Sequence, residues 1–295
     1  MMSYCHTPDS LEGFWWLTCY LTTGTHLSFY WSFAMIILLL VITAPLALLL
    51  GFGGALASGS RIAPLRWVGK TYTNMIRGVP ELIFFLFVPL ALDQAFEYLR
   101  HKAICPADSG PVYQGNDFVV CAAAKLPLNS ADEWIHSSYN FSLAVLAFAI
   151  VYGAFASNVL RGALDAVPKA QLETASSYGM NKKQLFWRVQ LPQMWGYALP
   201  GLSNLWIILV KATAVLFLLG IQDIVYWARA LGGTKTAAYY DYPHPDWRIW
   251  YFLALLVFHL LMTWSSGKVF NHLIKRTQHG QATLGGKSEI QVFAR

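Results

Sequence analysis

The chain has 295 residues, of which 56% are hydrophobic and 12% are charged, and its formal net charge is +6. Soluble domains carry roughly 25% charged residues, so this composition argues against a water-soluble globular domain and, more strongly, against a disordered chain. Four cysteines in a chain of this length are too few for a disulfide scaffold.

The first 27 residues precede any apolar run long enough to cross a membrane. They lack the basic region that begins a signal peptide. Residues 11–27 are rich in Trp, Tyr and Thr, and aromatic rings prefer the interface between membrane and water. We therefore expect residues 1–27 to form a periplasmic or interfacial N-terminal segment.

Five apolar runs follow, and each has about the 20 residues that a helix needs to cross roughly 30 Å of hydrocarbon. They cover residues 32–57, 79–99, 141–160, 197–224 and 247–270. A buried soluble helix could account for any one run, but five in one chain predict an all-α membrane protein with five transmembrane helices. The expected divisions are a five-span domain at 28–274 and a tail at 275–295.

The basic residues indicate how these spans are oriented. Fourteen of the 21 Lys and Arg residues lie after the first, third and fifth spans, six lie on the other side, and Lys211 falls inside the fourth span. Cytoplasmic loops carry an excess of Lys and Arg, so we expect the N-terminus outside and the C-terminus inside. The positive charge is then a topology signal, and nucleic acid is not an expected partner.

All four cysteines fall on the predicted outer side, where a bacterial periplasm would permit disulfides. Cys105 and Cys121 lie in one polar loop, 101–139, which is long for a connection without structure of its own. We predict a disulfide between them. The alternative is two free thiols in a loose loop.

The inner loop between the third and fourth spans, 163–195, is expected to contain two short helices. Residues 169–178 contain neither Gly nor Pro, and Gly179 can end their helix with a left-handed cap. Asn181 can cap a second helix that runs to about residue 190, where Pro192 stops it.

The second of these helices has one apolar face, formed by Leu185, Phe186 and Val189. An exposed apolar patch on such a loop suggests a protein partner. The alternative is that this face packs against the protein's own spans, and the pattern alone does not separate the two.

The same loop carries a motif, Glu173-Thr174-Ala175, then Gly179, then Val189-Gln190-Leu191-Pro192. It resembles the EAA loop of ABC importer permeases, with Thr174 and Val189 as mild departures. The stretches that flank it resemble the polar-amino-acid group of these permeases, which takes histidine, lysine and arginine, glutamate or opines. These stretches are Arg77-Gly78-Val79-Pro80, Arg161-Gly162-Ala163, Ala166-Val167-Pro168, and Asn204 followed by Lys211-Ala212-Thr213.

The resemblance implies the fold of a type I importer permease, in the bacterial inner membrane. Two permease subunits form one path above an ABC ATPase dimer, and a periplasmic solute-binding protein delivers a polar, basic or opine-like amino acid. The second permease is expected to be a paralogue rather than a second copy. Catalysis, a cofactor and a metal are not expected in this chain, because ATP and Mg²⁺ would be bound by the ATPase.

The resemblance further implies that the loop at 171–192 couples the spans to the ATPase. The residues assigned to coupling are Glu173, Ala175, Gly179, Leu185, Leu191 and Pro192. The alternative is that these residues shape only the loop itself.

The residues assigned to the substrate path are Arg77, Glu81, Asn158, Lys211 and Thr213. Lys211 lies within a span, where an ionisable residue is a functional candidate by default. Asn158 stands where the family usually has an acidic residue. Either the substrate differs, or a paralogous partner permease carries the specificity site.

An ion-coupled secondary transporter or a channel is the alternative function. That class would need paired intramembrane acids or repeated half-helices, and the sequence has neither pattern. ATP hydrolysis by this chain is disfavoured too, because Gly69-Lys70-Thr71 has Pro64 where a phosphate-binding loop needs Gly.

Overall fold

A computed structural model describes residue 5 and residues 13–75, 80–106, 110, 112–115, 117–128 and 130–278. The α-helices are α1 Gly13–Leu21, α2 Gly24–Ser58, α3 Ala63–Met75, α4 Glu81–Ile104, α5 Glu133–Ala166, α6 Lys169–Ser177, α7 Lys182–Leu185, α8 Leu191–Ala212, α9 Ile224–Gly232 and α10 Arg248–Gln278. Strands β1 Tyr113–Gln114 and β2 Asp117–Phe118 form one antiparallel hairpin. Shorter helical turns are η3 Ala122–Ala124, η4 Phe186–Gln190 and η5 Thr213–Leu219.

The prediction of five spans is confirmed within the described residues. Five helical stretches are long and apolar enough to cross a membrane: Gly24–Ser58, Glu81–Ile104, Glu133–Ala166, Lys182–Leu219 and Arg248–Thr277. The fourth ends earlier than the sequence indicated, at Leu219 instead of residue 224. Its end is set by Gly220, whose φ of +74° turns the chain away from the helix axis.

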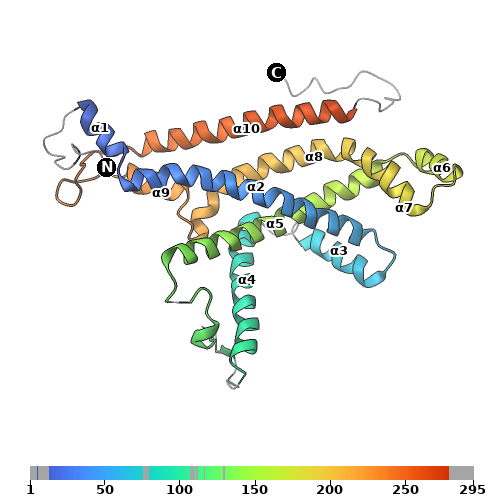
Figure 1. Cartoon of the computed structure of the whole chain (residues 1–295), viewed down its shortest axis with the longest axis horizontal. Coiled ribbons are helices and arrows are strands. Elements are labelled where there is room, and N and C mark those ends of the chain that lie inside the picture. The colour runs from blue at the N-terminus through green and yellow to red at the C-terminus, as the bar shows by residue number, and fades with distance from the viewer. Residues whose placement is uncertain are drawn as a thin grey trace.

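Helices α2, α5, α8 and α10 run along the long axis of the molecule, whereas α4 leaves the bundle at a steep angle (Figure 1). The centre of the bundle is α5. In the most apolar stretch of α5, 72% of the residues are buried, whereas 11% are buried in the corresponding stretch of α10. Small residues such as Ala147, Gly153 and Ala156 recur along α5. They let neighbouring helices approach closely, which explains why this span lies at the centre.

Helices α2 and α5 approach each other closely. A Cβ added at Gly51 would lie 2.7 Å from the Cβ of Ala156, and one added at Gly153 would lie 2.8 Å from the Cβ of Leu50. These glycines therefore set the distance between the two helices, and larger residues would push them apart.

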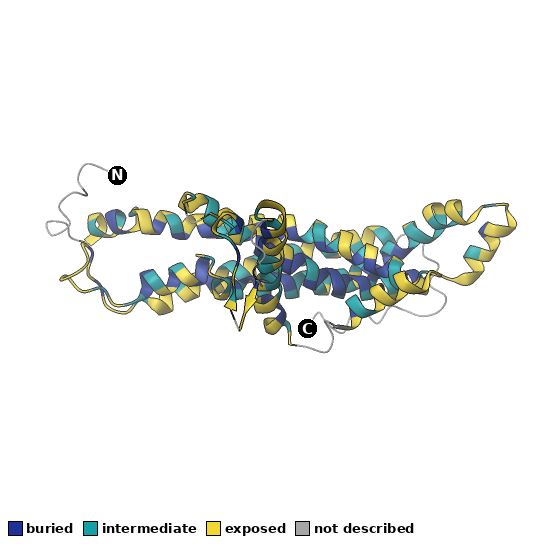
Figure 2. Cartoon of the chain, turned by 90° about the horizontal axis from the view of Figure 1, so that it is seen from below, coloured by how far each residue is buried: buried dark blue, intermediate teal, exposed yellow. Residues whose placement is uncertain are grey.

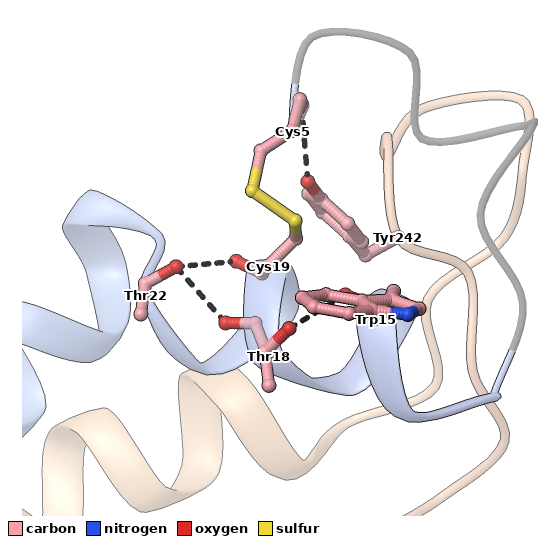
Figure 3. The surroundings of a disulfide bond; sticks show 6 residues. All are labelled: Cys5, Trp15, Thr18, Cys19, Thr22 and Tyr242. Carbon is pink, nitrogen blue, oxygen red and sulfur yellow. Dashed lines mark hydrogen bonds between the residues drawn. A yellow bond between two sulfur atoms is a disulfide. The ribbon is translucent and has the colours of Figure 1, made fainter. Parts of the chain in front are cut away.

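The N-terminal segment is fastened to the end of the bundle that carries α1. A disulfide joins Cys5 to Cys19 on α1, and the hydroxyl of Tyr242 donates to the carbonyl of Cys5 (Figure 3). Tyr242 belongs to the segment between α9 and α10, so this segment and the N-terminal segment meet here. The sequence analysis did not predict this disulfide.

A chain of hydrogen bonds continues from α1 into two spans. The Tyr20 hydroxyl lies 2.8 Å from Nε2 of His244 and 3.1 Å from the hydroxyl of Tyr251 on α10. The Tyr251 hydroxyl lies 2.7 Å from Nε2 of His26 on α2. Because buried polar groups are costly without partners, this network holds α1, α2 and α10 in one arrangement.

The predicted outer loop folds around a second disulfide, between Cys105 and Cys121, the pair that the sequence singled out. Two buried side chains of α4 receive the loop. Glu97 accepts the N–H of Leu126 at 3.0 Å, and Nδ1 of His101 accepts the N–H of Cys121 at 3.1 Å. The loop therefore has structure of its own, seated on the end of α4.

The spacing of α2 and α5 can be tested with two glycines of the same helix. Gly51→Ala should lower the free energy of unfolding by about 1–3 kcal/mol, because overpacking forces the helices apart. Gly53 faces open space, so Gly53→Ala should be neutral, or stabilising by about 0.5–1 kcal/mol from helix propensity. Thermal unfolding in detergent measures both, and equal midpoints would contradict the proposed role of Gly51.

Candidate functional site

The loop at 171–192 forms the end of the molecule opposite α1 (Figure 1). Helix α5 ends at Ala166, Val167 is extended, and Pro168 is the N-cap residue of α6, with a φ of −58° and a ψ of 125°. The residue before a proline is biased away from the helical region, which explains why α5 ends before Val167. The third span therefore leads into α6 after two residues, with little slack between them.

Helix α6 ends in a Schellman motif, as the prediction of a Gly179 cap requires. Gly179 has a φ of +80°, its N–H donates to the carbonyl of Ser176 at 3.0 Å, and the N–H of Met180 donates to that of Ala175 at 3.3 Å. These two bonds are the defining pair of the motif. They fix the direction in which the chain leaves α6.

The start of α7 is fixed equally well, and the predicted cap at Asn181 is confirmed. The Asn181 side chain accepts the N–H of Gln184 at 2.9 Å, and the Gln184 side chain accepts the N–H of Asn181 at 3.1 Å. This reciprocal pair is a capping box. The turn between α6 and α7 is thus closed by four hydrogen bonds.

The expectation that Pro192 stops the second helix is wrong. Helix α7 passes through the π-helical turn η4 into α8, which begins at Leu191, and the whole stretch Lys182–Leu219 is one helical span. Pro192 lies in the first turn of α8. The wider π turn avoids the clash that proline causes within an α-helix. The second short helix is therefore continuous with the fourth span.

An apolar cluster joins this loop to three spans. Its buried members come from α2, α5 and α8 and the residue after α5: Ala55, Leu160, Ala163, Leu164, Val167, Met194 and Ala198. Leu172, Phe186 and Leu191 pack against it from the loop and the start of α8. Phe186 therefore packs against the protein's own spans, which was the alternative to binding a partner.

Two aromatic side chains of the loop remain exposed, Tyr178 at 83% and Trp187 at 57%. Exposed residues predominate at this end in Figure 2. Neither aromatic residue was predicted from the sequence as a contact for a partner, although a large aromatic residue within a polar loop could have indicated one. Tyr and Trp are enriched at protein interfaces. The end of the loop that carries Tyr178 and Trp187, which we call the α6–α7 tip, therefore has the composition of a docking surface.

The residues predicted for coupling fall into two groups. Glu173 is exposed and Leu185 is partly buried, so both can reach a partner. Ala175 is buried, Gly179 forms the turn, and Leu191 and Pro192 begin α8. The second group shapes the loop and holds it to the spans.

The residues predicted for the substrate path come from separate elements. Arg77 lies outside the described residues, as do Gly78 and Val79. Glu81 begins α4, Asn158 is partly buried on α5, and Lys211 is exposed near the end of α8. Thr213 is fully buried, and its hydroxyl donates to the carbonyl of Val210 at 2.8 Å. In this conformation the Thr213 hydroxyl is hydrogen-bonded within its own helical stretch.

A cavity of about 210 Å³ lies between α2, α5, α8 and α10. Its lining is largely apolar, with Ala44, Leu48, Leu202 and Phe270 among its side chains. Tyr152 and Trp206 also line it, and the Tyr152 hydroxyl and the Trp206 Nε1 have no hydrogen-bond partner among the described residues. A polar amino acid would find few groups there to replace its hydrogen bonds to water.

Burial shifts the pKa of two of the ionisable groups outside the spans. It raises the pKa of Tyr72 to about 12, and the Tyr72 hydroxyl donates to the carbonyl of Ile150 at 2.7 Å, which joins α3 to α5. Burial also raises the pKa of Asp223 to about 6, opposed by the hydrogen bond from the N–H of Tyr226.

His101, Cys105 and Cys121 place their potential ligand atoms within 4.8 Å of one another. Metal ions bind cysteine as thiolate, and here both sulfurs belong to a disulfide. The cluster in this form is a structural link rather than a metal centre.

Residues 47–279 match the family described as binding-protein-dependent transport system inner membrane component. The Escherichia coli K12 histidine/lysine/arginine/ornithine transport system permease protein HisQ is 30% identical over 242 residues, or 81% of this chain and 87% of that protein. The arginine ABC transporter permease protein ArtQ of the same organism is 34% identical over 173 residues, 59% of this chain. That match spans 66%, just under two thirds, of the relative's length.

A solved structure, described as a crystal structure of an amino acid ABC transporter with histidines, has a TM-score of 0.59 at 20% identity. The match covers 90% of this chain and 99% of the chain in the solved structure. At this identity the likeness shows a shared fold.

Proposed function

The chain belongs to the family of binding-protein-dependent transport system inner membrane components, and we propose that it is the permease subunit of an ATP-driven importer for polar amino acids. It forms half of the translocation path and receives mechanical work through the loop at 171–192. The observation that carries this proposal is the α6–α7 tip, which is stiffly held to the spans and exposes aromatic side chains.

The tip is built to transmit displacement. A coupling element must not bend when it is pushed, and here four capping hydrogen bonds close the turn between α6 and α7. Helix α6 follows the third span after two residues, and α7 is continuous with the fourth. Movement of the tip therefore shifts two spans together, which supports Glu173, Tyr178 and Trp187 as residues that meet an ATPase.

The ATPase partner is a dimer that binds and hydrolyses ATP with Mg²⁺, so this chain needs neither cofactor nor catalytic residues. The proposal places the α6–α7 tip in the cytoplasm and the disulfide-bonded end in the periplasm. That orientation agrees with the excess of Lys and Arg on the tip's side and with the Cys5–Cys19 disulfide at the other end. The membrane is then the bacterial inner membrane, and a solute-binding protein docks on the periplasmic side.

A second permease subunit completes the path. Helix α4 leaves the bundle, and its apolar side chains Leu82, Phe87 and Leu90 are more than half exposed. A span that packs so little within its own subunit is available for a second one. Lys211 is exposed on α8, which supports a position at that interface or on the path.

The proposed substrate is a basic or opine-like amino acid, in line with the named substrates of two permeases to which this chain is similar. Asn158 offers hydrogen bonds but not the charge that would attract a cationic side chain. We therefore assign the main specificity contact to a paralogous partner permease, with Asn158 as a neutral contact. The ion-coupled alternative lacks a supporting observation among the described residues, since the two neighbouring acids of the α4 span, Asp93 and Glu97, are bound by Tyr139 and by the outer loop.

The contact with the ATPase can be tested by truncating an exposed aromatic at the tip. Trp187→Ala should abolish most ATP-dependent uptake of labelled arginine or histidine and weaken co-purification of the ATPase, because it removes an interface anchor. Trp134→Ala is the matched control, since Trp134 is 66% exposed at the other end of the bundle. Normal uptake and normal co-purification in Trp187→Ala would contradict the proposal.

The role of Asn158 can be tested by adding the missing charge. Asn158→Glu should raise uptake of arginine relative to a neutral amino acid several-fold, because a carboxylate in a low-dielectric path attracts the cationic side chain. Asn158→Gln controls for side-chain size. Competition uptake measurements compare the three proteins, and an unchanged substrate profile in Asn158→Glu would remove Asn158 from the path.

A further inference from the structure

A buried carboxyl group lies where the fourth span breaks. After η5, Gly220 turns the chain with a φ of +74°, and Asp223 then caps α9. Asp223 is only 2% exposed. Its Oδ1 accepts the N–H of Tyr226 at 2.8 Å, whereas Oδ2 has no hydrogen-bond partner among the described residues.

The surroundings of this carboxyl group are largely apolar. A cavity of about 10 Å³ lies beside it, close to the lower limit for one water molecule. Its lining includes side chains from α2, α5 and η5, namely Ser32, Ile36, Leu39, Phe141 and Leu216. Asp223 is the one ionisable side chain among the described residues that line it.

The cationic side chain of α9, that of Arg229, contacts an aromatic ring. On α9 itself, the guanidinium of Arg229 lies 4.8 Å from the centre of the Phe217 ring. An ionised carboxylate that is buried without a cation is strongly disfavoured, and such a group takes up a proton instead. A neutral acid keeps the Tyr226 bond on Oδ1 and presents Oδ2 to the cavity as a hydroxyl group.

We propose that Asp223 is a proton-binding gate residue: its protonation stabilises the packing of α9 against α2, and its ionisation favours the separation of α9 from α2. On separation the O–H bond of the acid breaks, the proton passes to water, and the carboxylate stays on Asp223. Proton binding therefore favours the closed arrangement of the α1 end, and acidity on that side should slow the opening that transport requires.

The sign of the pH effect follows from the direction of the pKa shift. Burial raises the pKa of Asp223 to about 6, above the ordinary value of 3.8, so the packed state binds more protons than the open one. The stabilising contribution is fully present below about pH 4 and is lost as the pH rises through about 6.

The test uses the complete transporter in proteoliposomes, with its binding protein at saturation. Asp223→Asn keeps a cap on α9, because Asn is an equally good N-cap residue, but it cannot ionise. Asp117→Asn is the matched control, since Asp117 is exposed in the β-hairpin at the end of α4. Uptake is measured at outer pH 5.5 and 7.5, and infrared spectra record the carbonyl band of protonated carboxylic acids over the same range.

The expected infrared result is a band in the wild type that disappears with a midpoint near pH 6 and is missing from Asp223→Asn. Wild-type uptake and that of Asp117→Asn should fall at least threefold from pH 7.5 to 5.5, whereas Asp223→Asn should keep the slow rate at both. Identical pH profiles and spectra in the wild type and Asp223→Asn would overturn the inference.

The uptake measurement rests on the proposed function, and the infrared measurement does not. Failure of the wild type to transport at either pH would refute the proposed function, while the infrared band would still decide whether Asp223 holds a proton. Transport by the wild type with a titrating band, but an unchanged uptake profile in Asp223→Asn, would refute the gating role.

Discussion

The mechanical connection between the α6–α7 loop and three spans depends on the apolar cluster that joins them. Met194 and Leu160 are completely buried there, and Phe186 packs against them from the loop. Burial of one such side chain contributes roughly 1.5–3 kcal/mol, so displacement of the loop independently of the spans is costly. The cluster makes the loop and the ends of α2, α5 and α8 one mechanical unit.

The opposite end of the molecule is held by different chemistry. The Cys5–Cys19 disulfide and a network of Tyr and His side chains fix α1 there, whereas the Cys105–Cys121 disulfide holds the outer loop at the end of α4. Between the two ends, the close contact of α2 and α5 at Gly51 keeps the bundle narrow. In the proposed mechanism, a push at the loop is carried along the helices toward α9, which follows the break of the fourth span at Gly220.

Much of this could be predicted from the sequence because it depends on local patterns. Apolar length predicted the five spans, and Gly179 and Asn181 predicted the turn of the loop, since left-handed caps and Asx caps depend on single residues. The spacing of Cys105 and Cys121 within one loop pointed to their disulfide.

The remainder depends on tertiary structure. Continuity of α7 with α8 through a π turn could not be read from Pro192, which normally ends a helix. Exposure of Trp187 beside the partly buried Phe186 is decided by what packs against the loop. The burial of Asp223 likewise needs side chains of α2 and α5 beside it, and Asp223 was not singled out from the sequence.

The most direct measurement is a cross-link from the tip of the loop. All four native cysteines are paired in disulfides, so Tyr178→Cys introduces a free thiol at an exposed position. In the assembled transporter a short bifunctional reagent should join this residue to the ATPase subunit, with a yield that changes when ATP is bound. A transporter that imports its substrate while this thiol reacts only with solvent reagents would contradict the account.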